Sequence, residues 1–201
     1  ASRLMPHQVI GEVCNQCGPE AVYVTDVGQH QMWAAQYIRH AKSRGFITSG
    51  GLGTMGFGLG AAIGAKQGNP EKTVIHITGD GCFRMNMNEI ATATRYNIPI
   101  IQVVINNHVL GMVRQWQNLF YGERYSSTTL YDKVDFVKLA ESYGAKGIRV
   151  TEKSEMKAAF EQAKANRALK VPTLIEFMLD PEVQVYPMVR PGGTLEDLLM
   201  D

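Results

Sequence analysis

The sequence predicts a single α/β domain with three layers, α/β/α, built around a mostly parallel central sheet. Two observations indicate this fold. The segments Thr73–Thr78 and Ile100–Ile105 are β-branched and mostly apolar, as expected of strands that are buried on both faces. Between them, Asn86–Tyr96 carries alanine and apolar residues at helical spacing, and Ile98-Pro99 stops that helix. Together these segments form a β-α-β unit.

Segments with strand and helix patterns continue on both sides of this unit, which supports the same architecture. Before it, the sequence predicts a helix over Met5–Cys17, a strand over Ala21–Thr25, a helix that starts near Met32-Trp33, and a short strand over residues 45–48. After it, the sequence predicts a helix with Met112, Val113 and Trp116 on one face, followed by a polar and aromatic loop over Phe120–Thr129. A helix over Asp135–Tyr143 and a strand over Ala145–Val150 come next. The last predicted elements are a helix capped by Ser154 and a strand over Thr173–Leu179. The tail from Asp180 onward is rich in proline and glycine, a composition often found in mobile chain ends.

Composition narrows the class of protein. The chain has 201 residues and a formal net charge of +1, and it has no basic block, so nucleic acid and anionic membranes are poor partners. No apolar run approaches the roughly 20 residues that span a bilayer, and no signal-peptide pattern opens the chain. We therefore expect a soluble domain, cytoplasmic in a bacterium or organellar in a eukaryote. Because the chain begins at Ala1 rather than methionine, we expect it to be a piece of a longer protein.

The three cysteines are an odd number, which argues against a disulfide framework. Cys14 and Cys17 form a C-x-x-C motif, but a zinc site would need a second pair, and Cys82 supplies at most one more ligand. A redox motif would follow a strand, whereas the pattern around Cys14 is helical. We interpret all three as ordinary free thiols.

Polar residues follow each strand of the β-α-β unit at the point where it ends. Gly79-Asp80-Gly81 follows the first strand, and Asn106-Asn107 follows the second. Ligands of open α/β sheets bind beyond the carboxyl ends of the strands, where a carboxylate and an amide oxygen can hold Mg²⁺. Gly81 allows a close approach to an anion, and the N–H groups of the following helix would face a phosphate. The predicted ligand is a magnesium diphosphate. Either motif alone would be ordinary turn or helix-cap chemistry.

A glycine-rich segment supports a rival hypothesis. Gly51, Gly53 and Gly56 form G-x-G-x-x-G, and Glu71 follows at about the spacing of the Rossmann dinucleotide fingerprint. On this hypothesis the domain binds NAD without Mg²⁺, and the pair Asp80 and Asn107 is incidental. The strand before the motif is short, and a single match to so short a motif is weak evidence.

Taken together, the motifs resemble one known family. The Gly79-Asp80-Gly81 and Asn106-Asn107 pair is similar to the magnesium-binding motif of thiamine-diphosphate-dependent enzymes. Four further segments resemble the large, catalytic subunit of acetohydroxyacid synthase, also called acetolactate synthase: Thr25–Trp33, Ser49–Gly56, Leu110–Gln117 and Tyr186–Val189. The resemblance covers nearly the whole chain, but only the C-terminal third of such a subunit. It implies one diphosphate-binding domain over residues 1–201, with residues 180–201 as a lid, and leaves the pyrimidine-binding and central FAD domains outside this sequence.

The resemblance also implies roles for individual residues. Asp80 and Asn107 would bind Mg²⁺ through their side chains, and Val109 through its carbonyl group. The expected cofactor contacts are Gln29 and His30 on the diphosphate, the carbonyl group of Gly53 on the aminopyrimidine, Met55 as the support for a V-shaped cofactor, the backbone at Gly79, Gly81 and Cys82, and Gly111 with Met112. Cys82 stands where the family commonly has serine, a change that a backbone donor tolerates. His108 is expected to face solvent.

One helix face is assigned to the substrate. The resemblance implies that Met112, Val113 and Trp116 line a substrate and herbicide channel, and that Trp116 helps select 2-ketobutyrate. A simpler interpretation remains open at this point, since the spacing of these three residues is typical of one buried helix face. Likewise, Met55 could be a core filler, and His30 could cap or pack against its helix.

The implied activity is the decarboxylation of pyruvate on thiamine diphosphate, followed by addition to a second pyruvate or to 2-ketobutyrate, in branched-chain amino acid biosynthesis. The parent enzyme would also carry FAD, form a homo-oligomer (a dimer or a tetramer), and possess a regulatory small subunit in some cases. In the family, the glutamate that activates the cofactor comes from a neighbouring subunit, so no catalytic residue is assigned here and the chain alone is expected to be inactive. The alternatives are another thiamine enzyme acting on 2-oxo acids, and a non-enzymatic interaction module.

Overall fold

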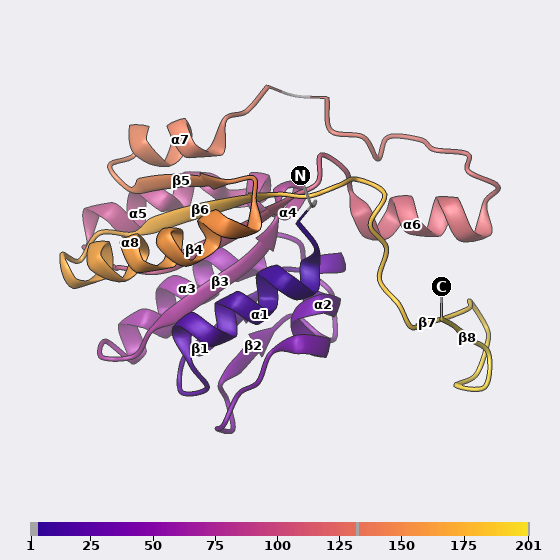
Figure 1. The fold of residues 1–201 in the computed structure, drawn as a ribbon, viewed down its shortest axis with the longest axis horizontal. Coiled ribbons are helices and arrows are strands. Elements are labelled where there is room, and N and C mark those ends of the chain that lie inside the picture. The colour runs from indigo at the N-terminus through magenta and orange to yellow at the C-terminus, as the bar shows by residue number, and fades with distance from the viewer. Residues whose placement is uncertain (1–3, 132, 201) are drawn as a thin grey trace.

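The computed structural model describes residues 4–131 and 133–200, so Ala1 and the outermost ends of the predicted 1–201 domain lie outside the described residues. Six strands form one sheet in the order β2-β1-β3-β4-β6-β5, and all neighbours in it are parallel (Figure 1). These strands are β1 (Val22–Thr25), β2 (Phe46–Thr48), β3 (Val74–Gly79), β4 (Ile101–Asn106), β5 (Lys146–Val150) and β6 (Thr173–Met178). The predicted parallel sheet is confirmed, and each predicted strand agrees with the observed one to within one residue at either end.

Helices cover both faces of the sheet, which gives the predicted three layers (Figure 1). One face carries α1 (Pro6–Cys17), α2 (Gln29–Tyr37) and α8 (Met156–Ala168); the other carries α3 (Phe57–Gly68), α4 (Asp80–Asn86), α5 (Ile90–Arg95) and α7 (Phe136–Ser142). Successive residues of a strand point to opposite faces. Tyr23 accordingly belongs to the core under α1, whereas Val22 and Val24 belong to the core under α3.

The predicted helix over Asn86–Tyr96 is wrong in its extent. The chain becomes helical directly after β3, at Asp80, and Asn86 then leaves the helical conformation (φ −149°, ψ 30°). The Nδ2 group of Asn86 donates a hydrogen bond of 2.6 Å to the carbonyl group of Gly56, which holds this break in place. A 3₁₀ turn, η1 (Met87–Glu89), and then α5 follow.

The predicted cap at Ser154 is also wrong. Ser154 lies inside a 3₁₀ turn, η2 (Lys153–Glu155), that precedes α8. The carboxylate of Glu155 accepts the N–H groups of Thr151 and Glu152 at 2.8 and 3.0 Å, so it supplies the cap from within the turn. Backbone N–H groups at a helix start donate to any well-placed oxygen, and the carboxylate of Glu155 reaches back to them here.

One helix and the tail extend beyond the sheet (Figure 1). These are α6 (Gly111–Phe120) and the antiparallel hairpin of β7 (Met188–Val189) and β8 (Leu198–Leu199). The tail is anchored before it reaches the hairpin, because Val185 is fully buried. The loop after α6 returns to the sheet edge, where Leu110 donates its N–H to the carbonyl group of Thr128 at 2.8 Å. Within the described ranges, no helix is both long and apolar enough to cross a membrane.

Candidate functional site

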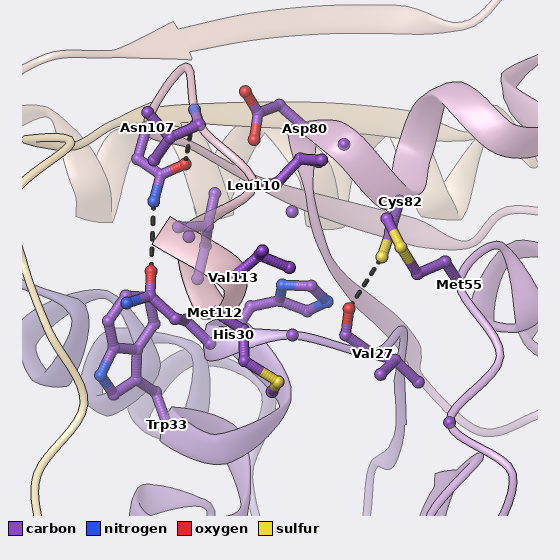
Figure 2. Close-up of a pocket in the computed structure, with 18 residues that line it drawn as sticks. Val27, His30, Trp33, Met55, Asp80, Cys82, Asn107, Leu110, Met112 and Val113 are labelled. Carbon is purple, nitrogen blue, oxygen red and sulfur yellow. Dashed lines mark hydrogen bonds between the residues drawn. The ribbon is translucent and has the colours of Figure 1, made fainter. Parts of the chain in front are cut away.

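A cavity of about 190 Å³ lies at the carboxyl edge of the sheet, where β1, β3 and β4 end. It is lined by Val27, Gly28, Gln29, His30, Trp33, Gly53, Met55, Gly79, Asp80, Gly81, Cys82, Ile105, Asn107, Val109, Leu110, Gly111, Met112 and Val113 (Figure 2). Every residue that the sequence assigned to the cofactor or the metal is in this set. The structure therefore brings together residues from distant parts of the chain at the edge where α/β sheets bind ligands.

Asp80 is the first residue of α4 and only 1% exposed. Its Oδ2 atom is buried without a hydrogen-bond partner. Burial raises the pKa of Asp80 to about 7, although the positive charge of Arg84 and the N–H of Gly81 act in the opposite direction. A carboxylate buried in this way is strongly destabilised unless a positive charge compensates it. A carboxylate at this position is suited to binding a cation.

Asn107 directly follows β4, the neighbour of β3, so its amide lies near the same edge as Asp80. Its Oδ1 atom accepts the N–H of Val109 at 3.2 Å, and its Nδ2 group donates to Oε1 of Gln29 at 3.3 Å (Figure 2). His108 is exposed, as expected, and its positive φ of 58° turns the chain between Asn107 and Val109.

His30 lies in the first turn of α2, which begins at Gln29 rather than near Met32-Trp33 as predicted. Its ring packs where glycine leaves room, since a Cβ atom on Gly28 or Gly79 would come within 2.9 or 2.8 Å of the ring. Burial lowers the pKa of His30 to about 4, so the ring is neutral near pH 7. Its Nε2 atom is buried and has no hydrogen-bond partner.

The start of α4 forms another wall of the cavity. Its first N–H groups belong to Asp80, Gly81 and Cys82, which all line the cavity. A Cβ atom on Gly81 would lie 2.5 Å from Cδ2 of Leu110, so any larger residue would require that side chain to move. The thiol of Cys82 donates to the carbonyl group of Val27 at 2.9 Å (Figure 2), and burial raises its pKa to about 12. The thiol is therefore occupied and protonated.

The loop between β2 and α3, which carries Gly53 and Met55 into the cavity wall, is held by Asp26, a residue that the sequence did not single out. Oδ1 of Asp26 accepts the N–H groups of Gly56 and Gly58 at 2.8 and 3.0 Å. Its Oδ2 atom accepts from the Oγ1 of Thr78 and lies 2.9 Å from Nε2 of His76. Burial alone would raise the pKa of Asp26, but its hydrogen bonds to His76 and Gly58 and the nearby imidazole lower it to about 2.

The predicted channel residues lie on an open surface of α6. Val113 is 53% exposed and Trp116 is 36% exposed, so the interpretation of this helix face as buried packing is wrong. With Met112, they line a second cavity of about 530 Å³, next to the first. The residue of α6 that is buried is polar, Gln115, at 2% exposure. Nothing in the sequence indicated that Gln115 is buried, because a glutamine in an amphipathic helix is normally on the solvent-exposed face.

Residues 26–177 match the family model described as thiamine pyrophosphate enzyme, C-terminal TPP binding domain. The chain belongs to this family. Thiamine pyrophosphate is thiamine diphosphate, so the matched domain is the one that the sequence motifs indicated. The match spans every residue of the cavity described above.

The chain is also similar in sequence to acetolactate synthases. The chain is 47% identical over 199 residues to an acetolactate synthase of Mycobacterium bovis, and the matched region covers 97% of this chain. It is 47% identical over 180 residues to the acetolactate synthase isozyme 2 large subunit of Escherichia coli, covering 90% of this chain. It is 45% identical over 192 residues to a probable acetolactate synthase large subunit of Methanocaldococcus jannaschii. The chain spans 32% of the length of each of these relatives.

A solved structure has the same fold. A thiamine diphosphate-dependent 4-hydroxybenzoylformate decarboxylase of Rhodococcus jostii superimposes with a TM-score of 0.81 at 27% sequence identity. The match covers 90% of this chain and 33% of that one.

The rival dinucleotide hypothesis does not fit this arrangement. Gly53 lies at the carboxyl edge of the sheet and Gly56 precedes α3, as the fingerprint requires. Glu71, however, comes before β3 begins at Val74, which places it at the amino edge. In a Rossmann site the acidic residue must reach the ribose beside the glycine loop. Here the glycines and the acid lie at opposite edges of the sheet.

The residues present fit a diphosphate with a divalent cation. One buried carboxylate oxygen and one buried imidazole nitrogen lack partners in the cavity, and they belong to Asp80 and His30. Among the described residues, no group of three or more His, Cys, Asp and Glu side chains could hold a metal by itself. A cation at Asp80 would therefore depend on amide, carbonyl and phosphate oxygens, which is the usual Mg²⁺ arrangement at phosphates.

Proposed function

We propose that residues 1–201 form one diphosphate-binding domain in which Mg²⁺ joins thiamine diphosphate to the carboxyl edge of the sheet. Asp80 and Asn107 contribute side-chain oxygens and Val109 contributes its carbonyl oxygen, while phosphate oxygens and water complete the roughly six ligands of Mg²⁺. The observation that carries the proposal is the buried, unpartnered Oδ2 atom of Asp80 in a cavity at this edge.

The remaining walls suit the rest of the cofactor. The neutral ring of His30 has one nitrogen free to hydrogen-bond a phosphate oxygen, and the N–H groups at Gly81 and Cys82 add backbone donors. Gly53 and Met55, on the loop held by Asp26, face the aminopyrimidine. When bound, the cofactor supplies the carbon nucleophile for a 2-oxo acid and accepts the electrons released with CO₂. The protein orients it and excludes water.

In this proposal the side chain of Gln29 does not contact the diphosphate. It lines the cavity, but its Nε2 group already donates to Oε1 of Gln115 at 2.9 Å and to the carbonyl group of Val183 at 3.1 Å. A direct side-chain bond from Gln29 to the diphosphate would require one of these bonds to open. We therefore assign diphosphate contact at Gln29 to its backbone at the start of α2.

The parent enzyme in this proposal is an acetolactate synthase large subunit that joins pyruvate to pyruvate or 2-ketobutyrate. The support is the 47% identity to acetolactate synthases, against 27% to the decarboxylase, which disfavours a simple decarboxylase. Met112, Val113 and Trp116 would line the substrate channel, where one methylene contributes about 1–3 kcal/mol of selectivity. FAD, a homo-oligomeric assembly, a regulatory small subunit, the lid role of residues 180–201, and a cytoplasmic or organellar location belong to the same proposal.

We expect the chain by itself to form no acetolactate. Asp80 is the only carboxylate among the described residues that line the cavity, and it is assigned to the metal. The activating glutamate would have to come from a pyrimidine-binding domain of a neighbouring subunit. A colorimetric acetolactate assay on the pure chain with pyruvate, Mg²⁺ and cofactor tests this, and steady product formation that scales with chain concentration would show the expectation to be wrong.

The binding proposal is tested by calorimetric titration of the chain with thiamine diphosphate, with and without Mg²⁺. Wild type should bind only with Mg²⁺, and Asp80→Ala should lose this binding. Asp197→Ala is the matched control, because Asp197 is an exposed carboxylate bonded to Thr194 in the hairpin. Equal binding by wild type and Asp80→Ala, or binding of NAD in place of thiamine diphosphate, would refute the proposal.

A further inference from the structure

A buried glutamine pair connects the cavity to the C-terminal tail. Gln115 of α6 is 2% exposed and Gln29 of α2 is 5% exposed, and they join through Nε2 of Gln29 and Oε1 of Gln115 at 2.9 Å. Buried amides are costly unless their hydrogen bonds are made, and these two residues come from segments 86 positions apart. Neither is required for packing volume alone, since an apolar side chain could fill the same space.

On the tail side, Gln115 bonds to both backbone groups of one residue. The N–H of Val185 donates to Oε1 of Gln115 at 2.9 Å, and Nε2 of Gln115 donates to the carbonyl group of Val185 at 2.8 Å. Gln29 adds a bond to the carbonyl group of Val183 at 3.1 Å. The tail is thus held to the two glutamines through its main chain, at a residue that is fully buried.

The backbone groups of the tail determine which way each amide must face. An N–H can only donate, so Val185 fixes Oε1 of Gln115 toward itself. Gln29 must then offer its Nε2 group to that oxygen and to Val183, because both are acceptors. This leaves Oε1 of Gln29 directed at Asn107, 3.3 Å from its Nδ2 atom. Asn107 therefore points its amide nitrogen at Gln29 and keeps its oxygen for Val109 and the cavity.

The space around this chain of amides is tight. A Cβ atom on Gly111 would lie 2.0 Å from Oε1 of Gln29 and 3.0 Å from Nδ2 of Asn107. The oxygen and the NH₂ group of the Asn107 amide are nearly the same size, so only their hydrogen bonds distinguish the two orientations of the amide. A half turn would place the oxygen against Oε1 of Gln29 and the NH₂ group against the N–H of Val109.

We propose that Gln29 and Gln115 form a polar relay through which the tail at residues 183–185 orients the amide of Asn107, presenting its oxygen to the metal site. Both glutamines are positioning residues. The proposal rests on the proposed function, in which Asn107 is a Mg²⁺ ligand, but the orientation of the amide exists without any ligand. Gln115 bonds to Gln29, and Gln29 bonds to Asn107, so removing the side chain of Gln115 tests the relay.

The first experiment follows the side-chain NH₂ signals of Asn107 by NMR in the ligand-free chain, labelled with ¹⁵N-asparagine. In Gln115→Met the hydrogen exchange of these protons should accelerate by about fivefold, as expected for the loss of one net hydrogen bond. In Gln115→Glu, burial favours the protonated carboxyl group, which keeps the acceptor for Val185 and Gln29 and can still donate to the carbonyl group of Val185, so this variant should restore slow exchange at Asn107. Glu182→Gln is the control: it removes the surface pair between Glu182 and Arg114 at 2.6 Å, which also ties the tail to α6, without touching the relay.

The second experiment measures the apparent Mg²⁺ affinity in the presence of thiamine diphosphate for the same variants. Gln115→Met should weaken it by about fivefold, whereas Gln115→Glu and Glu182→Gln should stay near wild type. A folded Gln115→Met protein with unchanged exchange at Asn107 would overturn the relay, whatever its Mg²⁺ affinity. If wild type shows no Mg²⁺ dependence at all, the metal site is refuted, and the exchange at Asn107 still decides the relay.

Discussion

Two residues in the cavity have pKa values displaced in opposite directions by the same cause. Burial raises the pKa of Asp80 to about 7 and lowers the pKa of His30 to about 4, because desolvation disfavours the charged form of each group. Near pH 7 the imidazole of His30 is therefore neutral and the carboxyl group of Asp80 is partly ionised. Binding of a cation beside Asp80 would be coupled to the ionisation of this carboxyl group, since a cation favours its charged form.

These pKa values predict an unusual pH dependence of stability. Asp80 stabilises the fold at low pH and loses this contribution as the pH rises from 4 through 7, because the native state holds its proton longer than the unfolded state. His30 acts in the opposite sense: its contribution is present above pH 6.5 and is lost as the pH falls through 4. Between pH 4 and 6.5 the two effects oppose each other in wild type.

Asp80→Asn removes one of the two effects. Without Mg²⁺, the variant should be more stable than wild type at pH 8 by about 1–3 kcal/mol, since no unpaired charge is buried. Its stability should fall more steeply than that of wild type between pH 6.5 and 4. Urea denaturation at pH 4, 6.5 and 8 measures both differences, and parallel pH profiles for the two proteins would contradict the assigned pKa of Asp80.

At the scale of residues, the sequence predicted those cavity residues that belong to a short motif and directly follow a strand. Asp80 and Asn107 were predictable because each directly follows an apolar strand, and parallel strands bring their carboxyl ends together. Asp26 and Gln115 were not, since the groups that they bind lie 30 and 70 positions away at Gly56 and Val185. A long-range hydrogen bond leaves no periodic signal in a sequence.

At the scale of elements, α3 shows how the same residue type has opposite roles on two faces of one helix. A Cβ atom on Gly58 would lie 2.3 Å from Nε2 of His76, so glycine is required on the inner face. On the outer face, Gly64 is exposed and nothing lies within 4 Å of a Cβ atom. Glycine there only adds freedom to the unfolded chain.

Gly64→Ala should therefore stabilise the domain by about 0.5–1 kcal/mol, the usual gain at an exposed helical position. Gly58→Ala should destabilise it, because His76 cannot move without breaking its bond to Asp26. Guanidinium unfolding of both variants measures the difference. A neutral Gly58→Ala would mean that His76 has more freedom than the structure shows.

The loop between β2 and α3 depends on one carboxylate. Asp26→Ala leaves four donors without their partner, those of Gly56, Gly58, His76 and Thr78, and should cost about 3–5 kcal/mol. Asp26→Asn retains one oxygen and should lie between this variant and wild type. Hydrogen exchange at the amides of Gly56 and Gly58 locates the effect. Exchange that stays slow in a folded Asp26→Ala protein would show that another group holds the loop.

The boundaries of the helix after β3 were predicted less well than those of the strands. The helix expected at Asn86–Tyr96 begins at Asp80 because the chain turns helical at the strand end, although glycine and aspartate there resemble a loop. Its interruption at Asn86 depends on a tertiary hydrogen bond to Gly56. Propensity is overridden at both points by contacts from other parts of the chain.

At the scale of the whole molecule, the three layers followed from alternating strand and helix patterns, but the strand order did not. Neither β2 at one edge nor the position of β6 between β4 and β5 could be derived from local pattern, since each results from which helices pack on which face. The projection of α6 and the hairpin beyond the sheet was likewise unpredicted (Figure 1).

The whole domain should respond to its ligand as one unit. At a concentration of about 100 times its dissociation constant, thiamine diphosphate with Mg²⁺ should raise the free energy of unfolding by about 2.7 kcal/mol. For a domain of this size that raises Tm by about 5–10 °C. Differential scanning calorimetry of wild type should show this rise only with both components, and Asp80→Ala should show none. A rise with thiamine diphosphate alone would mean that the metal is dispensable.

The position of β6 also has a consequence during synthesis. Every cavity-lining residue lies between Val27 and Val113, yet β4, which ends at the cavity, has β6 as its second neighbour, over residues 173–178. While the nascent chain leaves the ribosome, β4 therefore keeps an open hydrogen-bonding edge until β6 emerges. The residues that line the cavity are thus synthesised before the strand that completes the sheet around them. Until β6 is synthesised, the free edge of β4 can pair with other nascent chains on the same messenger RNA.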